Sequence, residues 1–190
     1  IRRAWLERLA GEGRWPAYAE LYAPDGSTKR LCHYLDALIR TGRTGEAFAR
    51  VEQVWLSGDS RPAACDPAFD AWRAAGHLTP ELVWRRIALA MDAGNDRLAR
   101  YLGGLLPAAE RPWLERWLEV HRRPELVLDA PAFEEPHHRR AAILAHGLER
   151  LARSRPGEAA DALEVLEGRH PLPPALSERG RGAVGLALLR

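Results

Sequence analysis

Apolar residues recur along most of this chain at the three- and four-residue intervals that place side chains on one face of an α-helix. Residues 28–41 give an example, with apolar side chains at Leu31, Tyr34, Leu35, Leu38 and Ile39. No segment alternates apolar and polar residues for long enough to indicate a β-strand. The pattern therefore predicts an all-α fold.

Glycine residues mark the expected helix ends in the first half of the chain. We expect helices over residues 28–41, 44–57 and 66–75 and a fourth that begins at Thr79-Pro80, and these end at Gly42, Gly58, Gly76 and Gly94. Each glycine stands where a helix C-terminus favours the left-handed conformation. The glycines are 16, 18 and 18 residues apart, and two helices in roughly 34 residues are typical of a helix-hairpin repeat.

The second half continues with less regular helices. We expect them near residues 95–104, 107–122, 124–130, 137–154 and 157–168, and from residue 175 onward. The helices lack a signature of identical residue types at fixed positions, which a tetratricopeptide array has. We therefore predict an irregular α-superhelix, a tetratricopeptide-like solenoid of helix hairpins without that signature, over residues 1–190.

The charge pattern argues against nucleic acid as a partner. The 28 basic residues are offset by 26 acidic residues, which leaves a net charge of +2. Acids and bases are interleaved, whereas a nucleic-acid-binding protein concentrates its bases on one surface. The densest basic positions are the scattered pairs Arg85-Arg86, Arg122-Arg123 and Arg139-Arg140, which we interpret as solvent-exposed helix faces. No window reaches the ~20 uninterrupted apolar residues of a membrane span, so we expect none.

The sequence offers no convincing catalytic, cofactor or metal site. The stretch GEGR at residues 11–14 lacks the preceding strand of a phosphate-binding loop. Glu134, Glu135, His137 and His138 form the one acid–histidine cluster in the sequence, and it straddles Pro136. Acids and imidazoles are ordinary at a helix start, so we interpret the cluster as the beginning of the helix at 137–154. We expect no catalytic residue, no cofactor and no metal.

One cysteine occupies an unusual position in the stretch WLSGDSRPAACDPAFDAW, residues 55–72. Asp66 and Pro67 are typical of an N-cap and first helical turn, which places Cys65 at a helix entrance. Cys32 is the other cysteine, and two thiols 33 residues apart do not supply a metal site. The residues alone leave open whether the two cysteines are free.

The seven tryptophans admit two interpretations. They could form a platform on which sugars stack, or they could wedge between neighbouring helices as part of the core. Trp55, Trp72 and Trp117 fall on apolar stripes, which favours the core.

A longer stretch, VWLSGDSRPAACDPAFDAWRAAGHLTPELVWRRIALAMDAGN at residues 54–95, resembles the superhelical U-domain of the soluble lytic murein transglycosylases. The Trp55-Leu56 step before Gly58, the Ala64-Cys65-Asp66 step and the Ala93-Gly94-Asn95 ending are among the features that carry the likeness. It extends upstream through RLCHYLDALIRTGRTGEAFA, residues 30–49, where Cys32 corresponds to the other cysteine of the family.

The resemblance implies a periplasmic enzyme of the cell wall. In the family, a lysozyme-like domain cleaves the bond between N-acetylmuramic acid and N-acetylglucosamine in peptidoglycan and leaves a 1,6-anhydromuramic end without consuming water. The Glu-Ser step and the Gly-Leu-Met-Gln motif of that domain are absent from these 190 residues. We therefore expect a noncatalytic scaffold whose partners are peptidoglycan and a catalytic domain encoded downstream. The alternative is a tetratricopeptide-like module that recruits other cell-wall enzymes.

Two expectations about particular residues follow from the resemblance. Because the periplasm is oxidising, Cys32 and Cys65 are expected to form a disulfide. Because peptidoglycan carries peptide carboxylates, exposed arginines are expected to hold it weakly and in a salt-sensitive way. Arg85, Arg122 and Arg139 are the candidates, since each belongs to a local basic pair.

Overall fold

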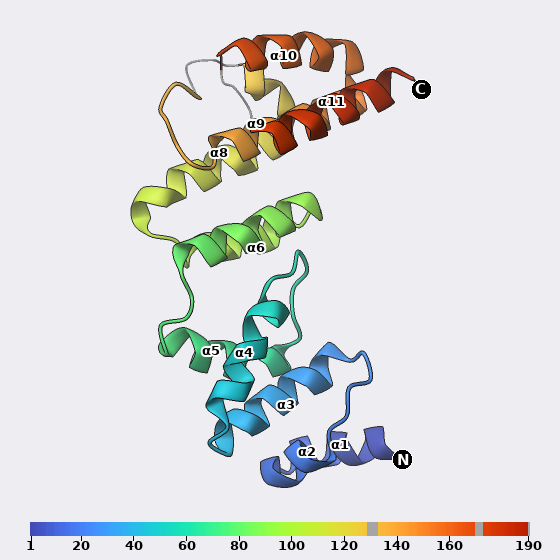
Figure 1. Cartoon of the computed structure of the whole chain (residues 1–190), viewed down its shortest axis with the longest axis vertical. Coiled ribbons are helices and arrows are strands. Elements are labelled where there is room, and N and C mark those ends of the chain that lie inside the picture. Colours follow the sequence, from blue (N-terminus) through green and yellow to red (C-terminus); the bar gives the residue numbers. More distant parts are fainter. Residues whose placement is uncertain (129–132, 170–172, 190) are drawn as a thin grey trace. The chain divides into compact units, whose positions relative to one another are not determined.

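The computed structural model describes residues 1–128, 133–169 and 173–189, and within these ranges every regular element is a helix (Figure 1). The chain divides into two compact units, Ile1–Leu105 and Leu106–Arg190. None of the described helices combines the length and the apolar character that crossing a bilayer requires.

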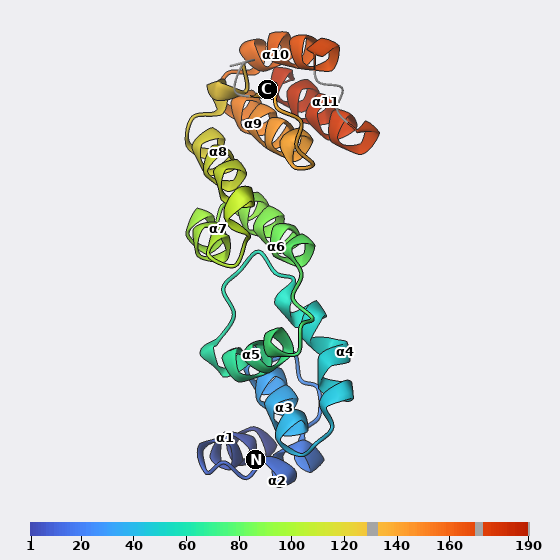
Figure 2. The ribbon, with the colours of Figure 1, turned by 90° about the vertical axis from the view of Figure 1, so that its left-hand side faces the viewer.

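The first unit is a series of short helices that pack mainly on their neighbours in the chain. Its elements are α1 (Arg2–Gly11), α2 (Trp15–Leu21), α3 (Thr28–Arg40), α4 (Thr44–Trp55), the short 3₁₀ helix η1 (Ala63–Cys65), α5 (Asp66–Ala74), α6 (Pro80–Asp92) and α7 (Asp96–Gly103). Helix α3 contacts α2, α4, η1 and α5, and α7 lies beside α6, as Figure 2 shows.

The second unit is built around one long helix. Its elements are η2 (Ala108–Glu110), α8 (Arg111–Arg122), η3 (Pro124–Leu128), α9 (Arg140–Ser154), α10 (Pro156–Arg169) and α11 (Pro174–Leu188). Helix α9 contacts α8, η3, α10 and α11, and its side chains are buried at Ile143, Leu144, Leu148 and Leu151. It is therefore the centre of this unit's core.

Three of the four predicted glycine helix ends have the expected conformation. Gly42, Gly76 and Gly94 have φ angles of +82°, +81° and +72°, in the left-handed region that glycine adopts without strain. Gly58 does not have a positive φ, so the prediction is wrong there. A Cβ atom at this position would overlap the backbone carbonyl of Leu89 in α6, so glycine serves a close approach between two segments.

Several predicted boundaries shift because irregular segments replace helix ends. Helix α4 ends at Trp55 rather than residue 57, and α9 begins at Arg140 rather than residue 137. The helix expected over residues 124–130 is a 3₁₀ helix over Pro124–Leu128, and residues 129 and 130 lie outside the described ranges. Helices α1 and α2 were not predicted.

The entrance of α5 differs from the expected cap. Helix η1 runs directly into α5, so Asp66 already has helical angles, φ −57° and ψ −44°. An N-cap residue needs an extended backbone for its side chain to reach back to the free amides. Cys65 occupies the cap position and no side chain caps the helix, so the prediction for Asp66 is wrong.

The two cysteines form a disulfide, the pairing that the family resemblance implies. Cys32 lies on α3, Cys65 ends η1, and both side chains are fully buried. The bond therefore fixes the loop after α4 to the centre of the first unit. Trp55, Trp72 and Trp117 are also buried, as their positions on apolar stripes predicted.

Candidate functional site

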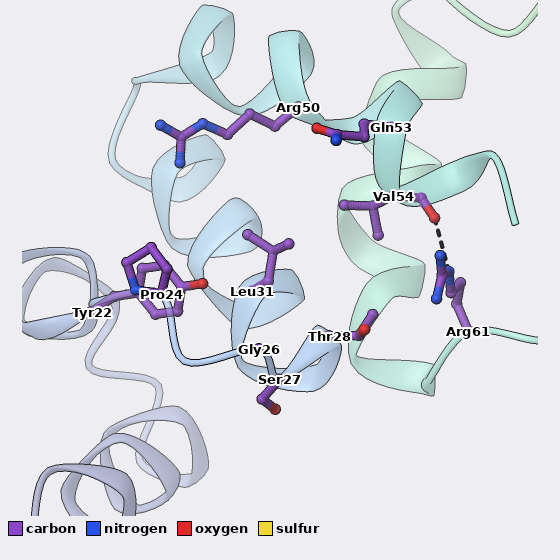
Figure 3. A pocket seen from close by; sticks show the side chains of 10 residues that line it. All are labelled: Tyr22, Pro24, Gly26, Ser27, Thr28, Leu31, Arg50, Gln53, Val54 and Arg61. Carbon is purple, nitrogen blue, oxygen red and sulfur yellow. Dashed lines mark hydrogen bonds between the residues drawn. The ribbon is translucent and has the colours of Figure 1, made fainter.

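A cavity of about 480 Å³ opens in the first unit beside the N-terminus of α3 (Figure 3). Its walls come from the segment after α2, from α3 and from α4, and are formed by Tyr22, Pro24, Gly26, Ser27, Thr28, Leu31, Arg50, Gln53, Val54 and Arg61. The local sequence builds this opening, because the Ser27 hydroxyl accepts the Arg30 amide and starts α3 after the irregular residues 22–26.

Aromatic rings and a cation lie at one side of this cavity. The rings of Tyr22 and Tyr34 stack with their centroids 4.4 Å apart, and the Arg50 guanidinium lies 5.9 Å from the Tyr34 ring. Burial raises the pKa of Tyr22, so its hydroxyl stays protonated near neutral pH. The cavity therefore offers hydroxyl, amide and guanidinium groups beside an aromatic surface.

Arg61 connects this cavity to a second one. Its Nε atom donates a hydrogen bond of 2.9 Å to the carbonyl of Val54, one of the last carbonyls of α4, which have no partner within the helix (Figure 3). Arg61 also lines a cavity of about 290 Å³ whose walls come from α4, α5, α6 and α7.

We call this second opening the arginine cavity. It is lined by Trp55, Ser60, Arg61, Asp66, Phe69, Arg86, Arg97, Leu98 and Tyr101. A neighbouring hollow shares Trp55, Asp66, Phe69 and Tyr101 with it and adds Asp70, Trp72, Arg73 and Leu78, of which Asp70 and Arg73 form an ion pair. Four arginines and several aromatic side chains therefore border one connected surface of the first unit.

Arg86 is the unusual member of the arginine cavity. Arg86 is only 4% exposed. Its guanidinium lies 4.1 Å from the Trp55 ring and 5.9 Å from the Phe69 ring. Burial, and then the like charge of Arg61, lower the pKa of Arg86 to about 10, so the group is still charged at neutral pH. Its Nε atom has no hydrogen-bond partner, and no carboxylate of the described chain pairs with it.

Sequence reasoning missed Arg86 because it grouped Arg85 and Arg86 as an exposed pair. A signal was available: Arg86 lies three residues after Val83 and four before Ala90, on the buried stripe of α6. Its neighbour Arg85 is exposed, with its Nη1 atom 3.3 Å from a carboxylate oxygen of Glu52 on α4.

The other predicted contact arginines, Arg122 and Arg139, belong to the second unit. The Nε atom of Arg122 donates to the Leu118 carbonyl at 3.3 Å. Arg139 is half-buried at the start of α9, where its backbone amide donates to Nδ1 of His137.

The acid–histidine cluster differs from its prediction in both place and membership. His137 and His138 lie in the turn before α9, Glu134 and Glu135 are exposed, and the acid beside the histidines is Glu110, distant in sequence. The Nε2 atoms of the two histidines lie 3.3 Å and 3.7 Å from the same Glu110 oxygen. Proximity in the fold, which no local pattern reveals, creates this group.

The ring of His137 favours hydrogen bonding over metal binding. Nδ1 accepts the amide of Arg139 at 3.1 Å, so in the neutral ring Nε2 carries the proton and can donate it to Glu110. A metal would need that Nε2 lone pair free. Burial and the neighbouring His138 lower the pKa of His137, and the ring stacks on Trp113 with centroids 4.3 Å apart.

Comparison with known sequences points to one family. The chain is 38% identical over 130 residues to the soluble lytic murein transglycosylase of Escherichia coli K12. The aligned residues make up 67% of this chain and 20% of that protein. The same enzyme of Salmonella typhimurium is 43% identical over the same length. The chain therefore spans about a fifth of the length of these relatives.

Comparison with solved structures gives a similar result. An inactive mutant of the lytic transglycosylase Slt from Pseudomonas aeruginosa matches 98% of this chain, with a TM-score of 0.87 and 32% identity, over 30% of its own length. The 70 kDa soluble lytic transglycosylase in complex with bulgecin A matches the whole chain with a TM-score of 0.83 and 27% identity. These matches confirm the predicted fold class, an all-α superhelix.

A further match points elsewhere. The profile of the cucumovirus coat protein family matches residues 39–123, which is less than half of the chain. Neither the similar sequences nor the similar structures support it, so we base no assignment on it.

Proposed function

Because this chain belongs to the soluble lytic murein transglycosylase family, we propose that it is a noncatalytic, helical part of a periplasmic enzyme that degrades peptidoglycan. The observation that carries the proposal is the structural match, which takes in 98% of this chain but 30% of the matched transglycosylase. Such a match is what a helical part of a longer enzyme gives. The chemistry of the whole enzyme then belongs to a domain outside these residues.

The reaction proposed for the whole enzyme is cleavage between N-acetylmuramic acid and N-acetylglucosamine, with a 1,6-anhydro end as product. The sequence motifs that carry this reaction in the family, the Glu-Ser step and Gly-Leu-Met-Gln, do not occur in residues 1–190. We assign no catalytic residue to this chain. Its proposed role is to hold the glycan strand and its peptides near the domain that cuts them.

Three arginines, of which Arg85 and Arg122 are exposed and Arg139 is half-buried rather than exposed as predicted, are proposed to contribute to that role. Arg85, Arg122 and Arg139 can pair with peptide carboxylates, although Arg85 must then exchange its contact with Glu52. Exposed pairs each contribute about 0–1 kcal/mol, so binding should be collective and weaken with salt.

A sacculus experiment tests both parts of the proposal. Purified chain is incubated with sacculi at low and high salt, and the pellet and the soluble products are analysed. We expect retention at low salt, release at high salt, and no soluble anhydromuropeptides. Anhydromuropeptides from a contaminant-free sample would overturn the noncatalytic role, and absence of retention at low salt would overturn the holding role.

A variant with all three arginines replaced by Gln should be retained less than wild type, and replacing the ion-paired Arg8, Arg43 and Arg100 serves as the control.

A further inference from the structure

The charge of Arg86 lacks a compensating anion within the described chain. A guanidinium is not deprotonated near neutral pH, and moving a charge out of water costs several kcal/mol unless a partner offsets it. The Trp55 ring, 4.1 Å from the guanidinium, offsets part of that cost through its negative face. The ring provides no hydrogen-bond acceptor in the plane of the guanidinium, and Nε remains without a partner.

The groups around Arg86 add positive charge rather than removing it. Arg61 and Arg97 line the same cavity, and Arg97 is exposed with no ion pair to the described residues. Asp66 also lines the cavity, but no arginine nitrogen of the described chain lies within ion-pair distance of its carboxylate. Three guanidinium groups therefore converge on a space that no acid of this part of the chain fills.

The residues that line this space suit a ligand that has apolar atoms next to its charged group. Trp55 and Phe69 form the inner surface, and Tyr101, 67% exposed, presents its ring at the outside. An exposed aromatic ring beside buried ones provides flat apolar area for an aliphatic chain or a sugar ring. An inorganic anion would leave this area unused.

We propose that the arginine cavity binds a carboxylate group of the peptide part of peptidoglycan, with Arg86 and Arg97 as its partners and Trp55 and Tyr101 in contact with the neighbouring apolar atoms. The identity of this ligand rests on the proposed function; the carboxylate chemistry rests on the cavity alone. Arginine forks pair bidentately with carboxylates, which gives the site its selectivity for that group.

Titration of the protein with soluble muropeptides, followed by calorimetry or by NMR shifts of the indole signals, tests the proposal. The first comparison is between muropeptides with free carboxylates and the same muropeptides after amidation. We expect amidation to weaken binding about tenfold, because a hydrogen bond to an ionised group is replaced by one to a neutral group. Equal binding of the two probes would overturn the proposal.

Variants locate the binding. R97Q and Y101A change exposed side chains and should each weaken muropeptide binding several-fold without altering the circular dichroism spectrum, and R86Q should abolish it. R86K keeps the charge but not the fork and should bind more weakly than wild type. R100Q, on the same helix as Arg97 but outside the cavity and paired with Asp96, is the matched control and should bind like wild type. Unchanged binding in folded R97Q and Y101A would place the ligand elsewhere.

A second probe separates this inference from the proposed function. This probe is an acetylated tripeptide with a free C-terminal carboxylate. It has the same charged group as a muropeptide but no sugar and does not come from peptidoglycan. If it binds in an Arg97-dependent way and muropeptides do not, the carboxylate chemistry is supported and peptidoglycan as its source is overturned. If muropeptides bind this cavity while the chain fails to sediment with sacculi, the site is supported and the holding role of the exposed arginines is not.

Discussion

Different interactions stabilise each of the two units of this protein. Unit Ile1–Leu105 consists of short helices, contains the disulfide, and has cavities bordered by arginines and aromatic rings. Unit Leu106–Arg190 has no cysteine, and in its described ranges long helices surround α9. Both units contain open space, since the second has a cavity of about 340 Å³ between α9 and α11. The difference is that a covalent bond stabilises the first unit, whereas the second depends on the packing of helices around α9.

Close packing in the second unit is clearest at Gly147. This residue lies in the middle of α9, and a Cβ atom there would overlap the side chains of Val120 in α8 and Val127 in η3. Gly180 in α11 similarly faces Leu148 of α9. Glycine lowers helix propensity, so its presence at positions 147 and 180 in particular reflects the distance at which these helices pack.

The largest expected effect is loss of the disulfide, which should weaken the first unit and spare the second. Closing a loop of 33 residues stabilises a fold by roughly 3–4 kcal/mol in the chain-entropy account. Replacing Cys32 and Cys65 by Ser should lower the free energy of unfolding by about that amount, measured by urea denaturation. Residue-resolved hydrogen exchange should locate the loss in residues 1–105. Equal loss of protection in both units would contradict the distinction between them.

The next largest effect concerns the second unit. Gly147→Ala should destabilise it by about 1–3 kcal/mol, because the added methyl group overpacks the contact with Val120 and Val127. Gly182→Ala in α11 is the matched control, since a Cβ atom there meets nothing within 4 Å. That variant should gain up to about 1 kcal/mol from helix propensity. Urea denaturation of both variants measures the difference, and a neutral Gly147→Ala would argue against tight packing of α9.

A smaller effect should appear on acidification. The pKa of His137 is lowered from its ordinary value of 6.5, mainly by burial, so the fold favours the neutral ring over the charged one. This contribution is fully present above about pH 6.5 and is lost as the pH falls through the lower pKa of the folded state.

Denaturation at pH 8 and pH 5 measures that contribution. His137→Asn should reduce the pH dependence of stability in the second unit, whereas the control His77→Asn, a change in the first unit, should leave it unaltered. An unchanged pH slope in His137→Asn would show that another group controls the effect.

The smallest effect is expected at Arg85. Its pair with Glu52 is half-exposed on both sides, so Arg85→Ala should change the free energy of unfolding by no more than about 0.5 kcal/mol, and by less in high salt. The same measurement on Arg86→Gln should give a larger change, because that side chain is buried against Trp55. Equal changes at the two neighbours would contradict the assigned burial.

The helices that the sequence predicted are those with strong local signals. Thr79 caps α6 by accepting the Leu82 amide, and Gly76 and Gly94 end helices in the left-handed conformation. Helices α1 and α2 escaped prediction because neither carries a long apolar stripe: α1 buries only Leu6 and Leu9, and α2 only Tyr18. Local chemistry therefore identifies helices whose ends it defines.

The candidate sites were harder to predict because they depend on contacts between distant segments. The fold of the second unit places Glu110 beside His137. The fold of the first unit places Arg61, Arg86 and Arg97 around one cavity. The disulfide was accessible through the family resemblance, since the spacing of Cys32 and Cys65 alone left their state open. Arg86 could have been recognised as buried from its place on the α6 stripe, but its lack of an acidic partner could not.

Asn95 has a consequence for how the first unit bears mechanical load. Its side-chain amide donates to the Gly58 carbonyl at 3.2 Å, and its carbonyl oxygen caps α7 by accepting the Leu98 amide. The interval 58–95 that it closes overlaps the interval 32–65 closed by the disulfide. A pull on the two ends of the unit passes from residue 32 to residue 65 through the disulfide, so residues 33–64 bear no tension. Extending residues 66–95 should break the Asn95 hydrogen bond to Gly58, while the covalent loop stays closed.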